Sequence, residues 1–508
     1  MIMRLVLITF TTLLFTGFNL SAEYPVNRPA RKTPAAAEGA YTVHPDQPKQ
    51  VIWGFGFEIQ SDSIGSGNIG LPEATTSVPH DLVPSERARF YQEMLKGFRY
   101  CRLAGGLYWR GLDSEQKFMR GRWPEQMSEL REMVEAAGIE GLSLEYWSPA
   151  PFWKANGAYV GTNKLTNLLR CFGPDFANDP VYHGDTNRFF KDFAAALVRD
   201  IQYLRERKLP VKFWGLQNEP RAWSVGADYS RCVYTPAQYE RAFSAVAPAI
   251  RQFDPKIEII ADSWELDCIA AVLRDPARRS LVDALVIHHI GSDANQVLTQ
   301  VPALRAKYGT DKPMFQNEYE YLAGPTSPAR CLNTVQHIMN WFQVGEAPTW
   351  FWIHALKPIK NKEASGYSLG FWRPTADLNA ADHPDFPGLK AGHWQWNKYN
   401  WHAVGSFVRH MPWDCRAVAV SEKDRDNDLR IFAFKRPNGK LTIVLSNRSF
   451  KAHVFKVETG LKEPVFKGWR YTPDDAGENF MGVKAGTLSG RTISPMVNDM
   501  TWEFWEEQ

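Results

Sequence analysis

Eight short apolar runs along the middle of the chain constrain its fold more than any other feature. They lie at residues 51–59, 100–104, 142–147, 212–217, 257–262, 284–290, 313–318 and 349–354. The longer segments between them repeat apolar residues at spacings of three and four, which is typical of amphipathic helices. Parallel strands need such crossovers, and eight of them can close into a ring. The pattern therefore predicts an α/β fold, a (β/α)8 TIM barrel over residues 51–400.

A doubly wound open sheet is the alternative with the same alternation of strands and helices. Its nucleotide-binding form carries a GxGxxG turn between the first strand and the helix that follows it. Here Gly54-Phe55-Gly56 lacks the third glycine and does not open a helix. The barrel is therefore the favoured fold.

The sequence pattern changes after about residue 401. Short runs with alternating apolar residues recur at 416–420, 429–435, 441–445, 453–457, 466–471, 486–493 and 500–505. Turn sequences such as Pro437-Asn438-Gly439 separate them. This pattern predicts a C-terminal β-sandwich domain over residues 401–508. Residues 23–50 are rich in Pro and Ala, which is typical of a linker, and residues 40–50 are a candidate for an added strand of the sandwich.

The first 22 residues have the layout of a secretory signal peptide. Positive charge at residues 1–4 precedes an apolar run at 5–18, and Leu20-Ser21-Ala22 offers small residues for cleavage before Glu23. The alternative is an uncleaved membrane anchor, but the run is shorter than the ~20 residues of a spanning helix. We therefore expect a secreted or periplasmic protein without membrane contact after cleavage.

Charge and cysteine content argue against several classes of protein. The chain has 59 Lys and Arg against 56 Asp and Glu, a formal net charge of +3, so it is not a strongly basic nucleic-acid binder. Its six cysteines are widely spaced without a CxxC pair, which argues against a zinc site. Disulfides and buried free thiols both remain open. The 19 Trp exceed what a core needs and indicate ligand platforms, for which sugars are one candidate.

Two of the predicted strands end in similar polar motifs. The fourth ends in Gln217-Asn218-Glu219-Pro220 and the seventh in Gln316-Asn317-Glu318-Tyr319. Reactive groups of such barrels gather at the C-terminal ends of the strands, where strands four and seven face one another. Two carboxylates across this opening can hydrolyse a glycosidic bond, since one protonates the leaving oxygen while the other attacks or activates water. The alternative is that each glutamate caps a helix or pairs with an arginine.

Further motifs accompany these glutamates. Trp53-Gly54-Phe55-Gly56 lies on the first strand, residues 148–154 with Asn156-Gly157 follow the third, and Phe315 precedes Gln316-Asn317-Glu318 on the seventh. Together with Asn218-Glu219-Pro220 and the trailing β domain, they resemble the retaining (β/α)8 glycoside hydrolases of clan A, and glycoside hydrolase family 30 most. Family 86, the agarases and porphyranases, is the next candidate.

The resemblance implies catalytic roles for two glutamates. Glu219 matches the acid/base and Glu318 the nucleophile, with Glu320 as the rival nucleophile because alternate residues of a strand share a face. Asn218 matches the residue that holds the sugar 2-hydroxyl. Arg102, near the end of the second strand, matches the arginine that keeps the nucleophile ionised through its opposite charge. An ordinary ion pair lower in the barrel is the alternative for Arg102.

Aromatic and histidine residues complete the substrate site that the resemblance implies. Trp352, on the eighth strand, matches the floor of the subsite for the reacting sugar, and Trp153 follows the third strand. His288-His289-Ile290 departs from the His-x-Tyr of the clan. The contact of the missing tyrosine with the nucleophile must then come from Tyr319, Tyr321, another ring or His289.

Vicinal histidines also raise the hypothesis of an exported metal-dependent hydrolase that uses His288, His289 and Asp293. Adjacent residues of a strand face opposite ways, so the two histidines are poor ligands for a single ion. We therefore predict no metal and no cofactor.

The predicted function is a secreted, retaining glycoside hydrolase that cleaves β-glycosidic bonds of a polysaccharide by double displacement. Long loops and many rings favour endo action on xylan, β-glucan or galactan, and we expect a monomer. The alternatives are an agarase- or porphyranase-type galactanase, a transglycosylase and a non-catalytic carbohydrate-binding barrel. Basic residues in loops of the presumed active face admit an acidic or sulfated chain. They are Arg110, Lys154, Arg221, Lys357, Lys360, Lys362 and Arg373.

Overall fold

The computed structural model describes most of the chain after residue 36. The described residues are 37–59, 80–106, 109, 111, 124–161, 163, 165–221, 230–288, 293–319, 326–359, 366–377, 384–423 and 426–508. They all belong to one compact unit, Ala35–Gln508. The predicted signal peptide lies outside them. Within the described part, no helix combines the length and the hydropathy needed to cross a bilayer.

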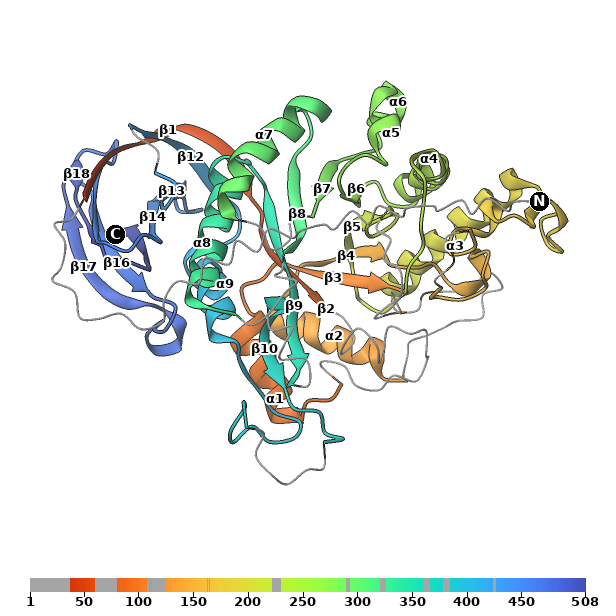
Figure 1. Cartoon of the computed structure of the whole chain (residues 1–508), viewed down its shortest axis with the longest axis horizontal. Coiled ribbons are helices and arrows are strands. Elements are labelled where there is room, and N and C mark those ends of the chain that lie inside the picture. Colours follow the sequence, from red (N-terminus) through yellow and green to blue (C-terminus); the bar gives the residue numbers. More distant parts are fainter. Residues whose placement is uncertain are drawn as a thin grey trace, which may run out of the picture. The chain divides into compact units, whose positions relative to one another are not determined.

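Eight parallel strands close into a ring (Figure 1). They are β2 (Gly54–Ile59), β3 (Tyr100–Gly105), β4 (Gly141–Tyr146), β5 (Val211–Gly215), β6 (Glu258–Trp264), β7 (Ala284–Ile287), β8 (Met314–Tyr319) and β9 (Thr349–Pro358). Each strand pairs with the next, and β9 pairs with both β8 and β2. The predicted TIM barrel is confirmed, with its strands where the apolar runs placed them.

Helices and short strands cover the outside of the ring. The helices are α1 (Pro84–Arg89), α2 (Gln126–Ala137), α3 (Thr186–Glu206), α4 (Pro236–Phe253), α5 (Ala270–Arg274), α6 (Pro276–Arg279), α7 (Val297–Tyr308), α8 (Pro328–Gln343) and α9 (Lys398–His410), and the π-helix η1 (Phe90–Leu95) continues α1. Thr235 and Gln238 form a capping box at the start of α4. Two further strands extend from β9: β10 (Ser368–Trp372) pairs parallel with β9, and β11 (Trp394–Trp396) pairs antiparallel with β10.

A single mixed sheet forms the C-terminal domain. Its strands are β12 (Cys415–Glu422), β13 (Leu429–Lys435), β14 (Leu441–Asn447), β15 (His453–Glu458), β16 (Val465–Tyr471), β17 (Val483–Ser489), β18 (Thr492–Ile493), β19 (Met496–Val497) and β20 (Thr501–Glu507). The sheet curls around an apolar core that includes Ile431, Ile443 and Phe455 (Figure 1). The predicted β-sandwich domain is thus present as one curled sheet.

The first strand of the chain belongs to this C-terminal sheet. β1 (Ala37–Ile52) pairs antiparallel with β12 and parallel with β15, so residues 37–50 form a strand where the composition indicated a linker. Pro48 lies at register shifts of the β1–β12 pairing, a position where a strand tolerates a residue without a backbone N–H. Pro45 and Pro48, the prolines of this range that the structure describes, are therefore accommodated by an irregular strand.

Helix α8 joins the barrel to the C-terminal sheet. Gln336 Nε2 donates a hydrogen bond to the Asp428 carbonyl at 2.8 Å, and Arg430 Nε donates to Asn340 Oδ1 at 3.0 Å. Phe342 stacks on Phe432 with a centroid separation of 5.9 Å. The predicted domain boundary at residue 400 falls within α9, which packs on α8.

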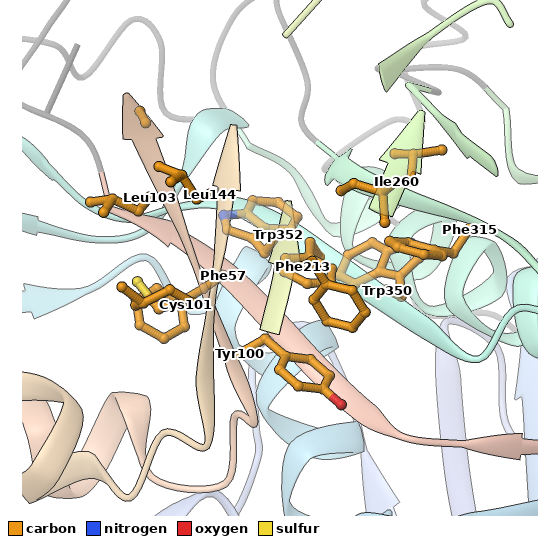
Figure 2. Close-up of a cluster of buried hydrophobic side chains, with 14 of the residues drawn as sticks. Phe57, Tyr100, Cys101, Leu103, Leu144, Phe213, Ile260, Phe315, Trp350 and Trp352 are labelled. Atoms are coloured by element: carbon orange, nitrogen blue, oxygen red, sulfur yellow. The ribbon is translucent and has the colours of Figure 1, made fainter. Parts of the chain in front are cut away.

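Aromatic rings fill the N-terminal end of the barrel. Phe213 lies in edge contact with Tyr100 at 4.9 Å and stacks on Trp53 at 5.9 Å between centroids. Phe315 stacks on Phe351 at 6.2 Å. Figure 2 shows Tyr100, Phe213 and Phe315 gathered between the strands. Because this end is packed with rings, the reactive groups belong at the opposite end, as the fold class predicts.

Candidate active site

Arg102 lies at the centre of the polar layer above these rings. It is fully buried on β3 and donates hydrogen bonds to acceptors from four different parts of the barrel. Its guanidinium also lies 4.5 Å from the centre of the Trp147 ring. Burial acts to lower the pKa of Arg102, but the neighbouring carboxylates outweigh it and raise the pKa. The acceptors are Glu58 Oε2 (2.6 Å), Glu145 Oε2 (2.6 Å), Asn218 Oδ1 (2.6 Å) and Glu318 Oε2.

A bulge in β8 brings Glu318 into this layer. Gln316 pairs with Trp350 and Tyr319 pairs with Trp352, so β8 has one residue more than β9 between these pairs. Asn317 and Glu318 both contact groups inside the barrel, since Asn317 bonds Glu145 and Glu318 bonds Arg102. Glu318 is 6% exposed. The bulge thus turns two consecutive polar side chains toward the opening.

Glu219 lies in a tight turn after β5. Its φ is +45°, and its backbone N–H donates to the Ser263 carbonyl at 3.3 Å. Such a conformation is uncommon for a residue other than glycine and costs about 1–3 kcal/mol. In this backbone conformation the Glu219 carboxylate faces His288, whose Nδ1 lies 2.9 Å from Glu219 Oε1.

The two glutamates meet across the opening. Carboxylate oxygens of Glu219 and Glu318 and a ring nitrogen of His288 all lie within 4.8 Å of one another. In retaining glycosidases the carboxyl groups are about 5–5.5 Å apart, against about 6.5–9.5 Å in inverting ones. An approach of one oxygen from each carboxylate to within 4.8 Å agrees with the shorter, retaining separation.

His288 joins the two carboxylates. Its side chain is fully buried, and its Nε2 lies 3.0 Å from Asn317 Oδ1 and 3.8 Å from Glu318 Oε2. Burial acts to lower the pKa of His288, but the charge of Glu318 and the hydrogen bond with Glu219 raise it overall. The imidazole can therefore hold or share a proton with Glu219.

Among the described residues, the groups spaced to hold a metal ion are engaged in other contacts. Both ring nitrogens of His288 have hydrogen-bond partners, so an ion between Glu219 and Glu318 would have to displace one. A second group, Asp262 with Asp267 and Cys268, also has suitable spacing. The Asp262 carboxylate accepts four backbone N–H bonds instead.

The metal ligand set raised by the sequence is not assembled in the described residues. Asp293 caps the 3-10 helix that follows it and forms an ion pair with Arg448 at 3.2 Å. His289 lies outside the described residues, as do Glu320 and Tyr321. The contacts of Asp293 therefore favour a structural role.

Three aromatic residues expected at the substrate are buried against protein. Trp352 and Tyr319 are 0% exposed, and Tyr319 lies 4.1 Å from the His337 ring of α8. Trp153 is 1% exposed and packs against Phe189 of α3. The Tyr319 and Trp153 rings thus pack against helices α8 and α3, and none of the three rings is exposed in the described structure. Alternation along β9 turns Trp352 outward while Phe351 fills the barrel.

The described basic residues do not favour an acidic substrate. Arg221 pairs with Asp267, and Arg373 pairs with Asp377 at 2.9 Å. Lys154 is buried and donates to the Tyr159 and Arg231 carbonyls and to Asn167. Burial lowers the pKa of Lys154 to about 8. Lys357 is buried as well, and the other three basic residues of the prediction lie outside the described part.

Four polar residues of this site were not identified from the sequence: Glu58, Glu145, Ser263 and Asn317. Glu58 and Glu145 interrupt apolar strands that are buried on both faces. A charge in such a position must be paired, and that signal was present in the sequence. Asn317 lay within the recognised motif, whereas nothing in the sequence marks Ser263. All six cysteines, left open above, are buried and free.

No family model matches the chain, and no curated protein matches it either. Solved structures do match. An exported protein from Bacteroides fragilis has a TM-score of 0.68 at 14% identity over 92% of this chain and 100% of that chain.

Two enzymes of known activity match over a similar extent. The catalytic domain of the family 30 xylanase C from Talaromyces cellulolyticus has a TM-score of 0.61 at 14% identity, covering 92% of this chain and 100% of that one. An endo-β1,6-glucanase has a TM-score of 0.63 at 14% identity, covering 95% and 96%. At such identities the likeness shows the fold alone. The chain therefore shares its fold with these two enzymes, one of which belongs to glycoside hydrolase family 30, the family that its motifs resemble.

Proposed function

We propose that this protein is a retaining glycoside hydrolase that cleaves β-glycosidic bonds of a polysaccharide. The observation that carries the proposal is the approach of Glu219 and Glu318 to within 4.8 Å across the mouth of the barrel. Arg102 supports the assignment of Glu318 as nucleophile, because its Nη1 donates a hydrogen bond to Glu318 Oε2 and holds the carboxylate at the barrel opening. His288 supports the assignment of Glu219 as acid/base, because it offers a proton-sharing partner.

The reaction proceeds in two displacements. Glu318 attacks the anomeric carbon with a carboxylate oxygen while Glu219 gives its proton to the leaving glycosidic oxygen, and the carbon–oxygen bond breaks. A water molecule then attacks the anomeric carbon of the ester. Glu219 accepts a proton from this water, and Glu318 leaves as a carboxylate. The product keeps the anomeric configuration of the substrate.

Asn218 and Arg102 prepare the site for the first step. Asn218 is 5% exposed, and its Oδ1 accepts from Arg102 Nη2, which leaves its amide N–H groups for the sugar 2-hydroxyl. The same guanidinium bonds Glu318, so the residue that binds the sugar and the nucleophile share one anchor. This shared anchor fixes their relative positions before substrate arrives.

The proposed substrate is a neutral β-linked polysaccharide, cleaved internally by a secreted monomer. Structures of similar fold include a xylanase and an endo-β1,6-glucanase, which makes xylans and β-glucans the first candidates. Galactans, including agar and porphyran, are the next candidate substrates. The internal pairing of the described basic residues places neutral chains before acidic or sulfated ones.

Reducing-sugar release from a panel of these polysaccharides tests the proposal. We expect release by the wild type, loss with Glu219→Gln or Glu318→Gln, and full release with Glu503→Gln. Glu503 is a matched control because it is fully buried and paired with Arg470 in the C-terminal sheet. Turnover that persists in both active-site variants would contradict the proposal. Binding without turnover would indicate a carbohydrate-binding barrel. Products longer than the substrate would indicate a transglycosylase.

A further inference from the structure

Glu145 is the junction of a buried hydrogen-bond network that reaches both catalytic carboxylates. It lies on β4 and is fully buried. Its Oε2 accepts from Arg102 Nε at 2.6 Å and from Asn317 Nδ2, and its Oε1 accepts from Ser263 Oγ. Three donors from three other segments therefore converge on one carboxylate. Because Glu145 Oε2 faces two N–H donors, a proton on this oxygen would point at a donor. Oε2 therefore acts only as a hydrogen-bond acceptor.

One arm of the network runs from Glu145 through Asn317 to His288. Since the carboxylate accepts only, it selects the NH2 group of Asn317 and turns the amide oxygen to His288 Nε2 at 3.0 Å. An amide oxygen also accepts only, so Nε2 must carry a proton. The remaining nitrogen, Nδ1, faces Glu219 Oε1 at 2.9 Å and shares the second proton with it.

The other arm runs from Glu145 through Arg102 to Glu318. The guanidinium is a rigid plane, so holding its Nε on Glu145 fixes the directions of its other N–H groups. Nη1 then donates to Glu318 Oε2 and Nη2 to Asn218 Oδ1. The same carboxylate thus orients the partner of the nucleophile and the partner of the acid/base.

We propose that Glu145 is a positioning residue that, through Asn317, keeps His288 protonated at Nε2 and leaves Nδ1 free to share a proton with Glu219. The catalytic consequence rests on the proposed function of Glu219, while the protonation of His288 does not. With Nδ1 able to accept, Glu219 can carry the proton that the leaving group needs. If the Asn317 amide turned over, Nε2 would accept, Nδ1–H would donate to Glu219 Oε1, and this oxygen could no longer share its proton with the imidazole.

The groups that face His288 come from several elements, and the test must separate them. Glu219 and Glu318 favour its protonated form and Arg102 opposes it, while Trp264 contacts the ring edge-on at 6.2 Å. Variants that leave these four residues intact therefore report on the Glu145–Asn317 arm.

The direct test is the protonation of His288 in the full chain at pH 7, measured by ¹⁵N NMR with labelled histidine. A His288→Gln variant identifies its signals among the 12 histidines. We expect Nε2 to be protonated in the wild type and in Glu145→Gln, because the glutamine oxygen can still accept from Asn317 and Arg102. We expect Nε2 to be unprotonated in Glu145→Met, where the freed Asn317 amide turns its NH2 to His288.

Two further variants keep the test decisive if Glu145→Met does not fold. Asn317→Ala removes the acceptor of the Nε2 proton while leaving the bond from Arg102 to Glu145, and should lower the fraction of His288 that is protonated at Nε2. Ser263→Ala removes a donor to Glu145 outside this arm and should keep Nε2 protonated. An identical state of Nε2 in the wild type and Asn317→Ala would overturn the proposal.

The catalytic consequence has a separate readout once a substrate is identified. In Asn317→Ala we expect kcat/KM to fall about 10²–10⁴-fold for substrates whose leaving group needs a proton, the usual range for general acid catalysis. Aryl glycosides with acidic leaving groups should be cleaved almost as fast as by the wild type. Equal losses for both classes would contradict the positioning role, whereas absence of any turnover in the wild type would contradict only the proposed function.

Discussion

The two ends of the barrel interior differ sharply although the same strands build both. At the N-terminal end, β3 and β8 contribute the rings of Tyr100 and Phe315. Two residues further along, a distance of about 7 Å on a strand, they contribute Arg102 and Asn317. The lower layer is held by packing of rings, which tolerates small shifts. The upper layer is held by hydrogen bonds between charged groups, each of which needs its own partner.

The comparison shows how stability and chemistry are divided within one core. Buried charges are expensive unless paired, and here one arginine serves three carboxylates. Positive φ values at Glu219 and Ser263 add backbone strain at the same end. The aromatic layer carries neither burden. We infer that the lower layer stabilises the barrel while the upper layer is arranged for reaction.

Replacing the nucleophile gives the largest expected effect in the upper layer. Glu318→Gln should lower kcat at least about 10⁴-fold, as loss of a covalent nucleophile does in other enzymes. Its thermal midpoint should stay the same or rise, because one of three carboxylates around Arg102 loses its charge. Reducing-sugar assays and thermal unfolding of the same preparations test both. A large fall in the midpoint would show that the upper layer also carries stability.

Truncating a ring gives the converse effect in the lower layer. Phe213→Ala removes a ring that touches Trp53, Tyr100 and Phe315 and should destabilise the protein by about 3–5 kcal/mol. The activity of the molecules that remain folded should change little. Urea unfolding at pH 7 gives the first quantity, and kcat well below the transition temperature gives the second. A fall in kcat without a fall in the free energy of unfolding would show that the lower layer serves the reaction rather than stability.

A milder change sharpens the role of the shared arginine. Arg102→Lys keeps the charge but cannot serve four acceptors with a planar fork, so we expect kcat to fall about 10²-fold. Arg470→Lys, at an ion pair in the C-terminal sheet, is the control and should leave kcat unchanged. If both variants keep wild-type activity, charge alone suffices at residue 102.

The smallest expected effect concerns pH and stability. The pKa of His288 is raised in the folded protein, so its contribution to stability is full below its unfolded value of about 6.5 and is lost as pH rises through the folded value. The stability advantage of the wild type over His288→Gln should therefore shrink as pH rises above 6.5. Denaturant titrations across pH 5.5–8.5 measure it.

His402 provides a control of opposite sign. Burial lowers its pKa, partly offset by a hydrogen bond to the Pro473 carbonyl. The wild type should thus lose stability relative to His402→Gln as pH falls below 6.5. If the stability difference between wild type and variant changed with pH in the same direction for both histidines, the directions of their pKa shifts would be contradicted.

The sequence predicted the frame of the molecule better than the contents of its site. The apolar runs located all eight barrel strands, because burial on both faces demands continuous apolar residues. The capping box of Thr235 and Gln238 is likewise a local sequence signature, and both of its hydrogen bonds are present. Strand ends located Glu219 and Glu318. These features depend on local sequence alone.

The features that escaped prediction depend on contacts between distant residues. Simple alternation placed Glu318 and Glu320 on one face, but the bulge in β8 turns Asn317 and Glu318 inward together. The sequence also did not show that the Trp352 ring would be fully buried. Glu145 gains its partners from three other segments, which no local pattern reveals.

The anomeric configuration of the first product tests the central claim most directly. If Glu219 and Glu318 act as the retaining pair that their approach within 4.8 Å indicates, a ¹H NMR time course should show the β-anomer first and the α-anomer only through later mutarotation. Initial formation of the α-anomer would mean inversion and would contradict the two-step scheme.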